Sequence, residues 1–136
     1  MRLPPHDSKA MRRSRGIEAT LVDNSKVVIR ATDVAQDSRE FEVAVAGPAA
    51  LLVAKLHKIH DRIDTPQRRD NKDAHDVYRL LRAVETPVFV EAIGRLLNEA
   101  LGGEVTCEAL GQLRELFAAG ARPRVPHGRC RGRVGR

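Results

Sequence analysis

The sequence predicts an α+β domain in which about three short antiparallel strands precede a bundle of about four helices. Two observations lead to this prediction. Runs rich in β-branched residues occur before residue 47 and end at a Gly-Pro pair. Beyond that pair, apolar residues recur three and four positions apart, which is the spacing of amphipathic helices. With 136 residues, the chain has the length of one domain at most.

The strands are expected in the first third of the chain. Residues 17–22 and 26–31 are rich in β-branched side chains and are separated by a turn-forming Asp-Asn-Ser triplet, which predicts a hairpin. Residues 41–46 (FEVAVA) alternate large apolar side chains with small or polar ones. This alternation predicts a third strand.

Helices are expected in the rest of the folded chain, over residues 48–62, 70–84, 87–101 and 106–119. Pro48 and Pro87 are well placed in the first turns of the first and third helices. Asp70 and Asn71 are both good N-caps for the second helix. A pair of glycines is expected to stop the third helix.

The positive charge of the chain is concentrated at its ends. Lys and Arg number 24 against 18 Asp and Glu, giving a net charge of +6, yet residues 120–136 contain six arginines and no acid. This Arg/Gly/Pro-rich tail has little to bury and is predicted to be disordered, as is the smaller basic segment 1–15. Residues 16–119 are left as the folded part. Two interpretations of the tail stay open, an arm that binds RNA and a GC-rich reading frame that has slipped.

Apolar runs in this sequence fall short of the roughly 18 residues needed to span a bilayer. The amino-terminal stretch also has charges where a signal peptide is apolar. We therefore expect a cytoplasmic protein with no membrane partner.

Charged side chains border the apolar faces of the first two predicted helices. At 100° per residue, Lys55 lies on the border of the apolar stripe of the first helix, with Lys58 and Arg62 along the same edge. In the second helix Asp73 extends the apolar stripe by one turn, so its carboxylate is expected to face inward, whereas Asp76 is expected to face away. If the two helices pack together, Lys55 or Arg62 can approach Asp73 beside a semi-buried cleft.

This charged group has two interpretations. In the first, Asp73 is a first-turn acid that is favoured by the helix dipole and balanced by a neighbouring cation, worth about 0.3–1 kcal/mol. In the second, Lys55 neutralises the phosphates of a nucleotide, with Lys58 and Arg62 beside it, and Asp73 orients the site.

Two motifs within residues 45–83 resemble a known family. Residues 48–56 read Pro-x-x-Leu-x-x-x-Lys-Leu, and about twenty residues later residues 72–76 read Lys-Asp-x-x-Asp. The stretch resembles the carboxyl-terminal half of nucleotidyltransferase-like proteins of the AbiEii/AbiGii toxin type, within the DNA polymerase β-like superfamily.

The resemblance implies a truncated nucleotidyltransferase-like fold and an activity. Such enzymes transfer a nucleotidyl group from an NTP to a hydroxyl with Mg²⁺, in some relatives to tRNA, and some members are toxins paired with an antitoxin. The resemblance implies that Lys55 and Asp73 are catalytic positions, with Asp76 as the second choice.

The chain departs from the family pattern at the metal site. The relatives hold two Mg²⁺ ions with an Asp-x-Asp or Asp-x-Glu strand and a third carboxylate on a following strand. This sequence contains no Asp-x-Asp or Asp-x-Glu, and Glu42 in the predicted third strand matches only the third position. The alternative for Glu42 is a solvent-facing side chain. We therefore expect a partial domain that lacks two of the three metal carboxylates and is inactive as it stands.

Three other interpretations stay open. The chain is alternatively a non-catalytic module that binds nucleic acid through its basic termini, or a protein-interaction module that docks through an exposed strand edge. A weaker pattern places a metal on His57, His60 and His75, although the first two are expected on the polar face of their helix and no fourth ligand is placed by spacing.

Overall fold

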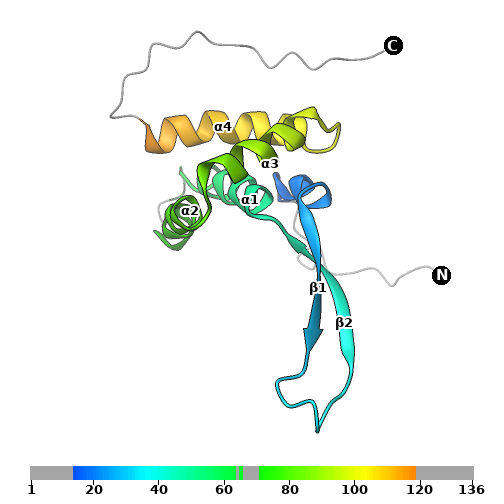
Figure 1. Ribbon diagram of the computed structural model, residues 1–136. Helices are drawn as coiled ribbons and strands as arrows, with labels where there is room; N and C mark the ends of the chain where they lie inside the picture. Colours follow the sequence, from blue (N-terminus) through cyan, green and yellow to red (C-terminus); the bar gives the residue numbers. More distant parts are fainter. Residues whose placement is uncertain (1–13, 64, 66–70, 119–136) are drawn as a thin grey trace, which may run out of the picture.

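The structure, a computed structural model, describes residues 14–63, 65 and 71–118 (Figure 1). Its elements are the 3₁₀ helix η1 (Ile17–Leu21), strands β1 (Asn24–Arg30) and β2 (Glu40–Ala46), and helices α1 (Pro48–His60), α2 (Asn71–Ala83), α3 (Thr86–Asn98) and α4 (Gly103–Phe117). The predicted α+β order of strands followed by four helices is confirmed, with two strands in the described part instead of about three. Most of the basic segments predicted at the two ends, residues 1–13 and 119–136, lies outside the described residues. None of the helices in the described ranges is long and apolar enough to cross a membrane.

The prediction of a strand over residues 17–22 is wrong, because this segment forms η1. The Gly16 amide donates to the Glu18 carboxylate at 2.8 Å, and the Thr20 hydroxyl donates to the Ile17 carbonyl at 2.7 Å. These local bonds satisfy backbone groups without a partner strand. Ala19 is fully buried and belongs to the hydrophobic core. Packing of this turn on the helical body therefore outweighs the β-propensity of its residues.

The strands β1 and β2 pair antiparallel, with Asn24 opposite Ala46 and Arg30 opposite Glu40. The β1–β2 hairpin therefore starts later than predicted and uses the segment expected to be a third strand. It projects away from the helices, as Figure 1 shows.

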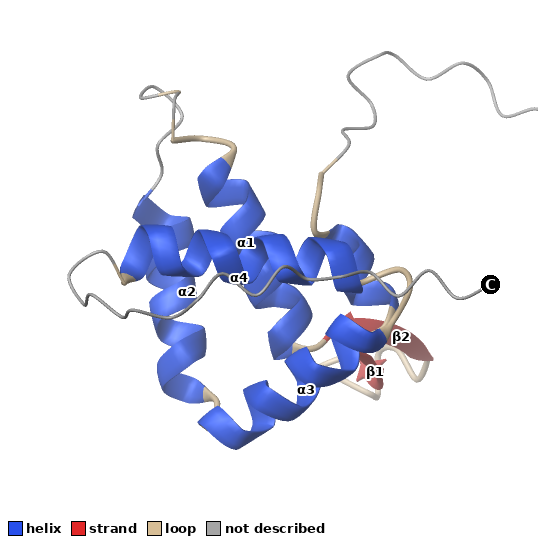
Figure 2. Ribbon diagram, turned by 90° about the horizontal axis from the view of Figure 1, so that it is seen from above, coloured by secondary structure: helices blue, strands red, loops and turns tan. Residues whose placement is uncertain are grey.

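The helix α1 lies at the centre of the helical body and contacts the other three helices and η1 (Figure 2). Its apolar stripe is buried as predicted, with Leu52 2% and Leu56 1% exposed. Val77 of α2 and Leu96 of α3 are fully buried in the same core. The four helices thus bury one shared core, to which the hairpin adds little.

The boundary between α3 and α4 lies three residues earlier than expected. Glu99 adopts an extended conformation, with φ −92° and ψ 138°, and ends α3. Gly103, expected to belong to the stop signal, is the first residue of α4, and its amide donates to the Glu99 carbonyl at 2.9 Å. A Cβ at this position would lie 2.9 Å from the Leu97 carbonyl oxygen, so the close approach of the two helix ends requires glycine.

The amino terminus of α1 is capped by Asp23, a residue that is distant in the sequence. The residue that precedes the helix, Gly47, has no side chain with which to cap it. The Asp23 carboxylate accepts a hydrogen bond from the Ala50 amide at 2.9 Å, and the Asp23 carbonyl accepts one from the Gly47 amide at 2.8 Å. Asp23, predicted only as a turn residue, thus ties the start of the hairpin to α1.

Replacing Asp23 by alanine is expected to lower the free energy of unfolding by about 1 kcal/mol, because the Ala50 amide in the first turn of the helix then loses its hydrogen-bond acceptor. Urea denaturation measures the loss. The control is Asp33→Ala, which removes a carboxylate that accepts a hydrogen bond from the nearby Ala35 amide in an exposed loop. Equal losses in the two variants would contradict the capping role.

Candidate functional site

The buried carboxylate of Asp73 forms ion pairs with three cationic side chains at the contact between α1 and α2. Its side chain is 2% exposed. The ammonium of Lys55 lies 2.8 Å from Oδ1, the ammonium of Lys58 lies 2.8 Å from Oδ2, and Nη1 of Arg62 lies 3.2 Å from Oδ2. The predictions that Asp73 faces inward and that Lys55 or Arg62 approaches it are therefore confirmed, and both cations do so together with Lys58. We call these four residues and Asp76 the ionic cluster.

The placement of Asp76 differs from the prediction. It was expected to face away from the apolar stripe, yet its Oδ2 lies 2.7 Å from the ammonium of Lys55. Its side chain is 29% exposed, at the edge of the helix contact. The flexible four-carbon stem of Lys55 lets its ammonium reach both carboxylates, a reach that helix periodicity alone does not reveal.

The pKa values of Asp73, Lys55 and Asp76 are each shifted in the direction that favours the charged form. Burial pushes the pKa of Asp73 upward, but the hydrogen bonds from Lys55 and Lys58 outweigh burial and leave the pKa below its ordinary value. The pKa of Lys55 is raised, first by its hydrogen bond to Asp73 and then by its hydrogen bond to Asp76. The pKa of Asp76 is lowered, chiefly by its hydrogen bond from Lys55.

The ionic cluster has one more cation than it has carboxylates. An ammonium has three N–H donors, and among the described residues Lys55 directs two of them to carboxylates. Lys58 is 41% exposed and Arg62 is 26% exposed, so both reach solvent. A guanidinium offers five donors, of which Arg62 gives one to Asp73. The arrangement can therefore accept an additional anion with several oxygens, such as a phosphate.

Glu42, the predicted metal ligand, is not brought to the ionic cluster. It lies on the projecting hairpin (Figure 1), is 55% exposed and pairs with Lys26 at 2.7 Å. In the part of the chain that the structure describes, no three His, Cys, Asp or Glu side chains are grouped so that they could hold a metal ion. The described residues do not fit a two-metal centre.

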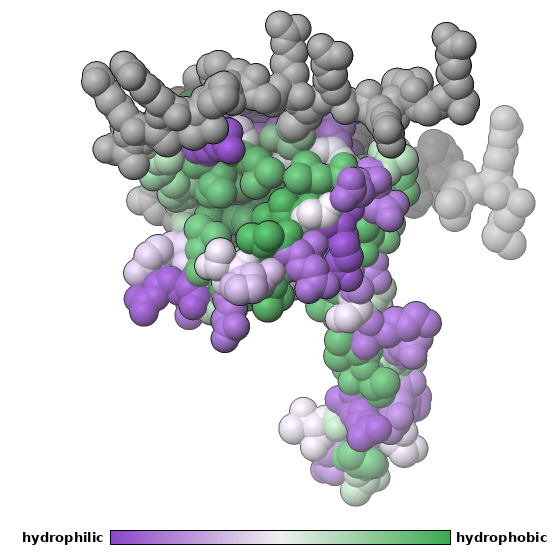
Figure 3. All heavy atoms as spheres, turned by 45° about the horizontal axis from the view of Figure 1, so that its top comes forward, coloured by the Kyte–Doolittle hydropathy of each residue, from purple (hydrophilic) through white to green (hydrophobic). Residues whose placement is uncertain are grey.

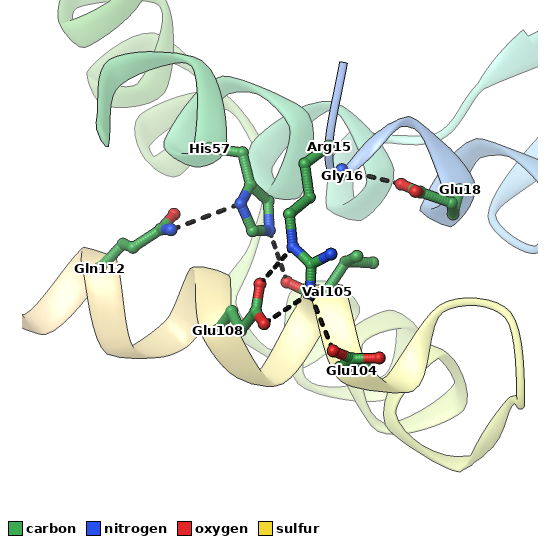
Figure 4. Close-up of polar contacts among 8 residues, drawn as sticks. All are labelled: Arg15, Gly16, Glu18, His57, Glu104, Val105, Glu108 and Gln112. Carbon is green, nitrogen blue, oxygen red and sulfur yellow. Dashed lines mark hydrogen bonds and ion pairs between the residues drawn. The ribbon is translucent and has the colours of Figure 1, made fainter. Parts of the chain in front are cut away.

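The expectation that His57 lies on the polar face of its helix is wrong. His57 is 2% exposed and faces α4 (Figure 4). Its Nε2 donates to the Val105 carbonyl at 2.8 Å, so in the neutral ring Nδ1 is the acceptor, 3.3 Å from Nε2 of Gln112. Because α4 covers this side of α1, His57 is a packed core residue, whereas His60 and His75 are exposed. The three histidines do not form a metal site.

One polar group was missed by the sequence reasoning. Arg15 spans two carboxylates of α4, with contacts of 2.9 Å to Glu104 and 2.6 Å to Glu108 (Figure 4). The available signal was the spacing of four residues between the two glutamates, which places them on one face of a helix.

Arg15 and Glu108 line a cavity of about 390 Å³ beside His57. A second cavity, of about 340 Å³, lies between Asp23 and α3. Neither of these two cavities is lined by a residue of the ionic cluster.

Comparisons of this chain with protein-family models, with curated proteins and with solved structures found no match. The resemblance of residues 45–83 to nucleotidyltransferase-like proteins therefore stays a prediction that depends on the two sequence motifs alone.

Proposed function

We propose that the ionic cluster binds the phosphates of a nucleotide and that residues 16–119 are a partial nucleotidyltransferase-like domain. The observation that supports this most directly is the convergence of three cations on one buried carboxylate, within 3.2 Å. One positive charge remains in excess when Asp76 is also counted. Asp73 offsets the mutual repulsion of the cations and holds their remaining donors in one place. This arrangement suits the several oxygens of a polyphosphate.

We expect the ionic cluster to bind a nucleotide, but we do not expect the described residues by themselves to transfer a nucleotidyl group. The sequence has no Asp-x-Asp or Asp-x-Glu, and Glu42 lies on another element. The chain's residues therefore supply cations in place of a metal, and NTP binding is expected to persist in EDTA. A tRNA or other RNA acceptor and an antitoxin partner are further proposals that follow from the resemblance alone. The alternative of a nucleic-acid-binding module depends on the basic termini, most of which lies outside the described residues.

The proposal is tested by isothermal titration of the full chain with ATP and with inorganic triphosphate in EDTA. Lys55→Ala is expected to weaken both ligands about tenfold to a hundredfold, because a hydrogen bond to a charged group contributes about 1.5–3 kcal/mol. Similar affinities for ATP and triphosphate are expected, since the cluster recognises phosphate oxygens.

Lys26→Ala is the matched control. It removes the same charge from a lysine that is also paired with a carboxylate at 2.7 Å, but on the hairpin, and is expected to leave binding unchanged. If Lys55→Ala lowers folding stability too far for titration, Lys58→Ala tests the same site, because Asp73 then keeps two cations. The proposal is wrong if the native chain binds neither ligand, or if Lys26→Ala weakens binding as much as the cluster variants.

A further inference from the structure

Helix α2 separates its charged side chains onto two sides. Its two acids, Asp73 and Asp76, both lie toward α1 and pair with Lys55. Its four basic side chains fall within about 80° of one another on the outer side of the helix, opposite the buried Val77. All four are exposed: Lys72, His75, Arg79 and Arg82. We call these four residues the basic stripe.

The basic stripe is a line of positive charge on the surface of the helical body. It rises by about 15 Å from Lys72 to Arg82, at 1.5 Å per residue. Among the described residues Arg79 has no hydrogen-bond or ion-pair partner, and Arg82 donates to the hydroxyl of Tyr78 at 3.2 Å. Hydrophilic side chains gather at the lower left of the helical body in Figure 3, the side on which α2 lies in Figure 1. The two guanidinium groups are therefore open to an anionic partner.

The composition of the basic stripe selects among anionic partners. A helix that binds an anionic membrane inserts its apolar face, whereas the apolar face of α2 packs in the core, where Val77 is fully buried. The core of a protein interface is depleted of charged side chains, and the stripe has no apolar member. One strand of a nucleic acid presents a phosphate about every 3.4 Å along its helix, so a line of about 15 Å can lie beside about four phosphates. A nucleic acid is therefore the partner that fits best.

Tyr78 lies beside the basic stripe and favours a single strand over a duplex. It is 54% exposed, and Cζ of Arg82 lies 5.8 Å from the centroid of its ring. An exposed aromatic ring beside cations is a surface on which an unpaired base can stack. In a duplex the faces of each base are covered by its neighbours, so the ring of Tyr78 offers this contact only to a single strand.

We propose that the outer side of α2 binds single-stranded nucleic acid, with phosphates on Lys72, Arg79 and Arg82 and one base stacked on Tyr78. This surface belongs to the helical body and is separate from the basic termini of the chain. None of these residues belongs to the ionic cluster, so the inference goes beyond the proposed nucleotide site and does not depend on it.

The proposal is tested by fluorescence anisotropy of a labelled oligothymidylate titrated with the full chain. Arg79→Gln/Arg82→Gln is expected to weaken binding about tenfold at physiological salt. Its slope of log affinity against log salt is expected to be shallower by about 1.4, because each phosphate contact of a single strand contributes about 0.7. The matched control is Arg95→Gln/Arg114→Gln, which removes two exposed arginines from α3 and α4 and gives the same net charge. The control is expected to bind like the native chain, since the basic termini contribute equally to both variants.

Two variants of Tyr78 test the stacked base. Tyr78→Ala is expected to weaken binding about tenfold, whereas Tyr78→Phe keeps the ring and is expected to bind like the native chain. Unchanged far-ultraviolet circular dichroism verifies that each variant is folded. Triphosphate binding is expected to be the same in both double arginine variants, which separates this surface from the ionic cluster.

Four outcomes would overturn the proposal. The first is a native chain that does not bind the oligothymidylate, and the second is an equal loss of binding in the two double arginine variants. The third is a Tyr78→Ala variant that binds like the native chain. The fourth is a poly-glutamate peptide of the same charge that binds as tightly and is weakened equally by Arg79→Gln/Arg82→Gln, because this would indicate an acidic protein partner.

Discussion

Replacing Asp73 by asparagine is expected to lower the free energy of unfolding by about 2–4 kcal/mol, because three cations then lose the carboxylate that offsets their repulsion. The carboxylate is 2% exposed and within 3.2 Å of Lys55, Lys58 and Arg62. The partial exposure of the cations keeps the loss below that of a fully buried ion pair. Urea denaturation at pH 7 measures it.

The control for this variant is Asp76→Asn on the same helix. Asp76 contacts the same lysine at 2.7 Å but is 29% exposed and has one cation, so a much smaller loss is expected. Equal losses would show that the burial of Asp73 does not organise the cluster.

The Asp73 variant is also expected to change the response to acid. The pKa of Asp73 is lowered in the folded state, so the unfolded chain binds the proton more readily. The stability that Asp73 contributes is therefore fully present above its unfolded pKa of about 4 and is lost as the pH falls through the folded pKa. The difference in stability between the native chain and Asp73→Asn should narrow below about pH 4. A difference that stays constant down to pH 2 would contradict the assignment.

Replacing Gly16 by alanine is expected to lower the free energy of unfolding by about 2–3 kcal/mol, from the left-handed backbone and from a steric clash. Gly16 has φ 92°, and a Cβ there would lie 2.6 Å from Cδ2 of His57. The His57 ring cannot move aside at low cost, because both of its nitrogens are hydrogen-bonded, one to the Val105 carbonyl and the other to the Gln112 side chain. Thermal and urea unfolding both measure this loss.

Gly111→Ala in α4 is the control and is expected to change stability in the opposite direction. A Cβ at this position meets nothing within 4 Å, and alanine is favoured over glycine inside a helix by about 1 kcal/mol. If Gly16→Ala were neutral, the segment with Gly16 and Arg15 would not be held against α1 and α4.

The sequence by itself determined most of the helical part of this protein. Periodicity, Pro48 and Asn71 predicted α1 and α2 to within a few residues, because caps and amphipathic spacing act within one or two helical turns. The same geometry showed that Asp73 faces inward, since a position on the apolar stripe must face the neighbouring helix.

Only the tertiary structure decided the features that depend on distant partners. His57 bonds to a residue 48 positions away, Asp23 caps a helix 27 positions away, and Arg15 reaches a glutamate 93 positions away. The same packing on α1 makes residues 17–21 a 3₁₀ turn instead of a strand. Helix periodicity gives the direction of a side chain from its own helix but does not say which surface covers it. The burial of His57 and the position of Glu42 away from the ionic cluster were therefore decided only when the elements packed together.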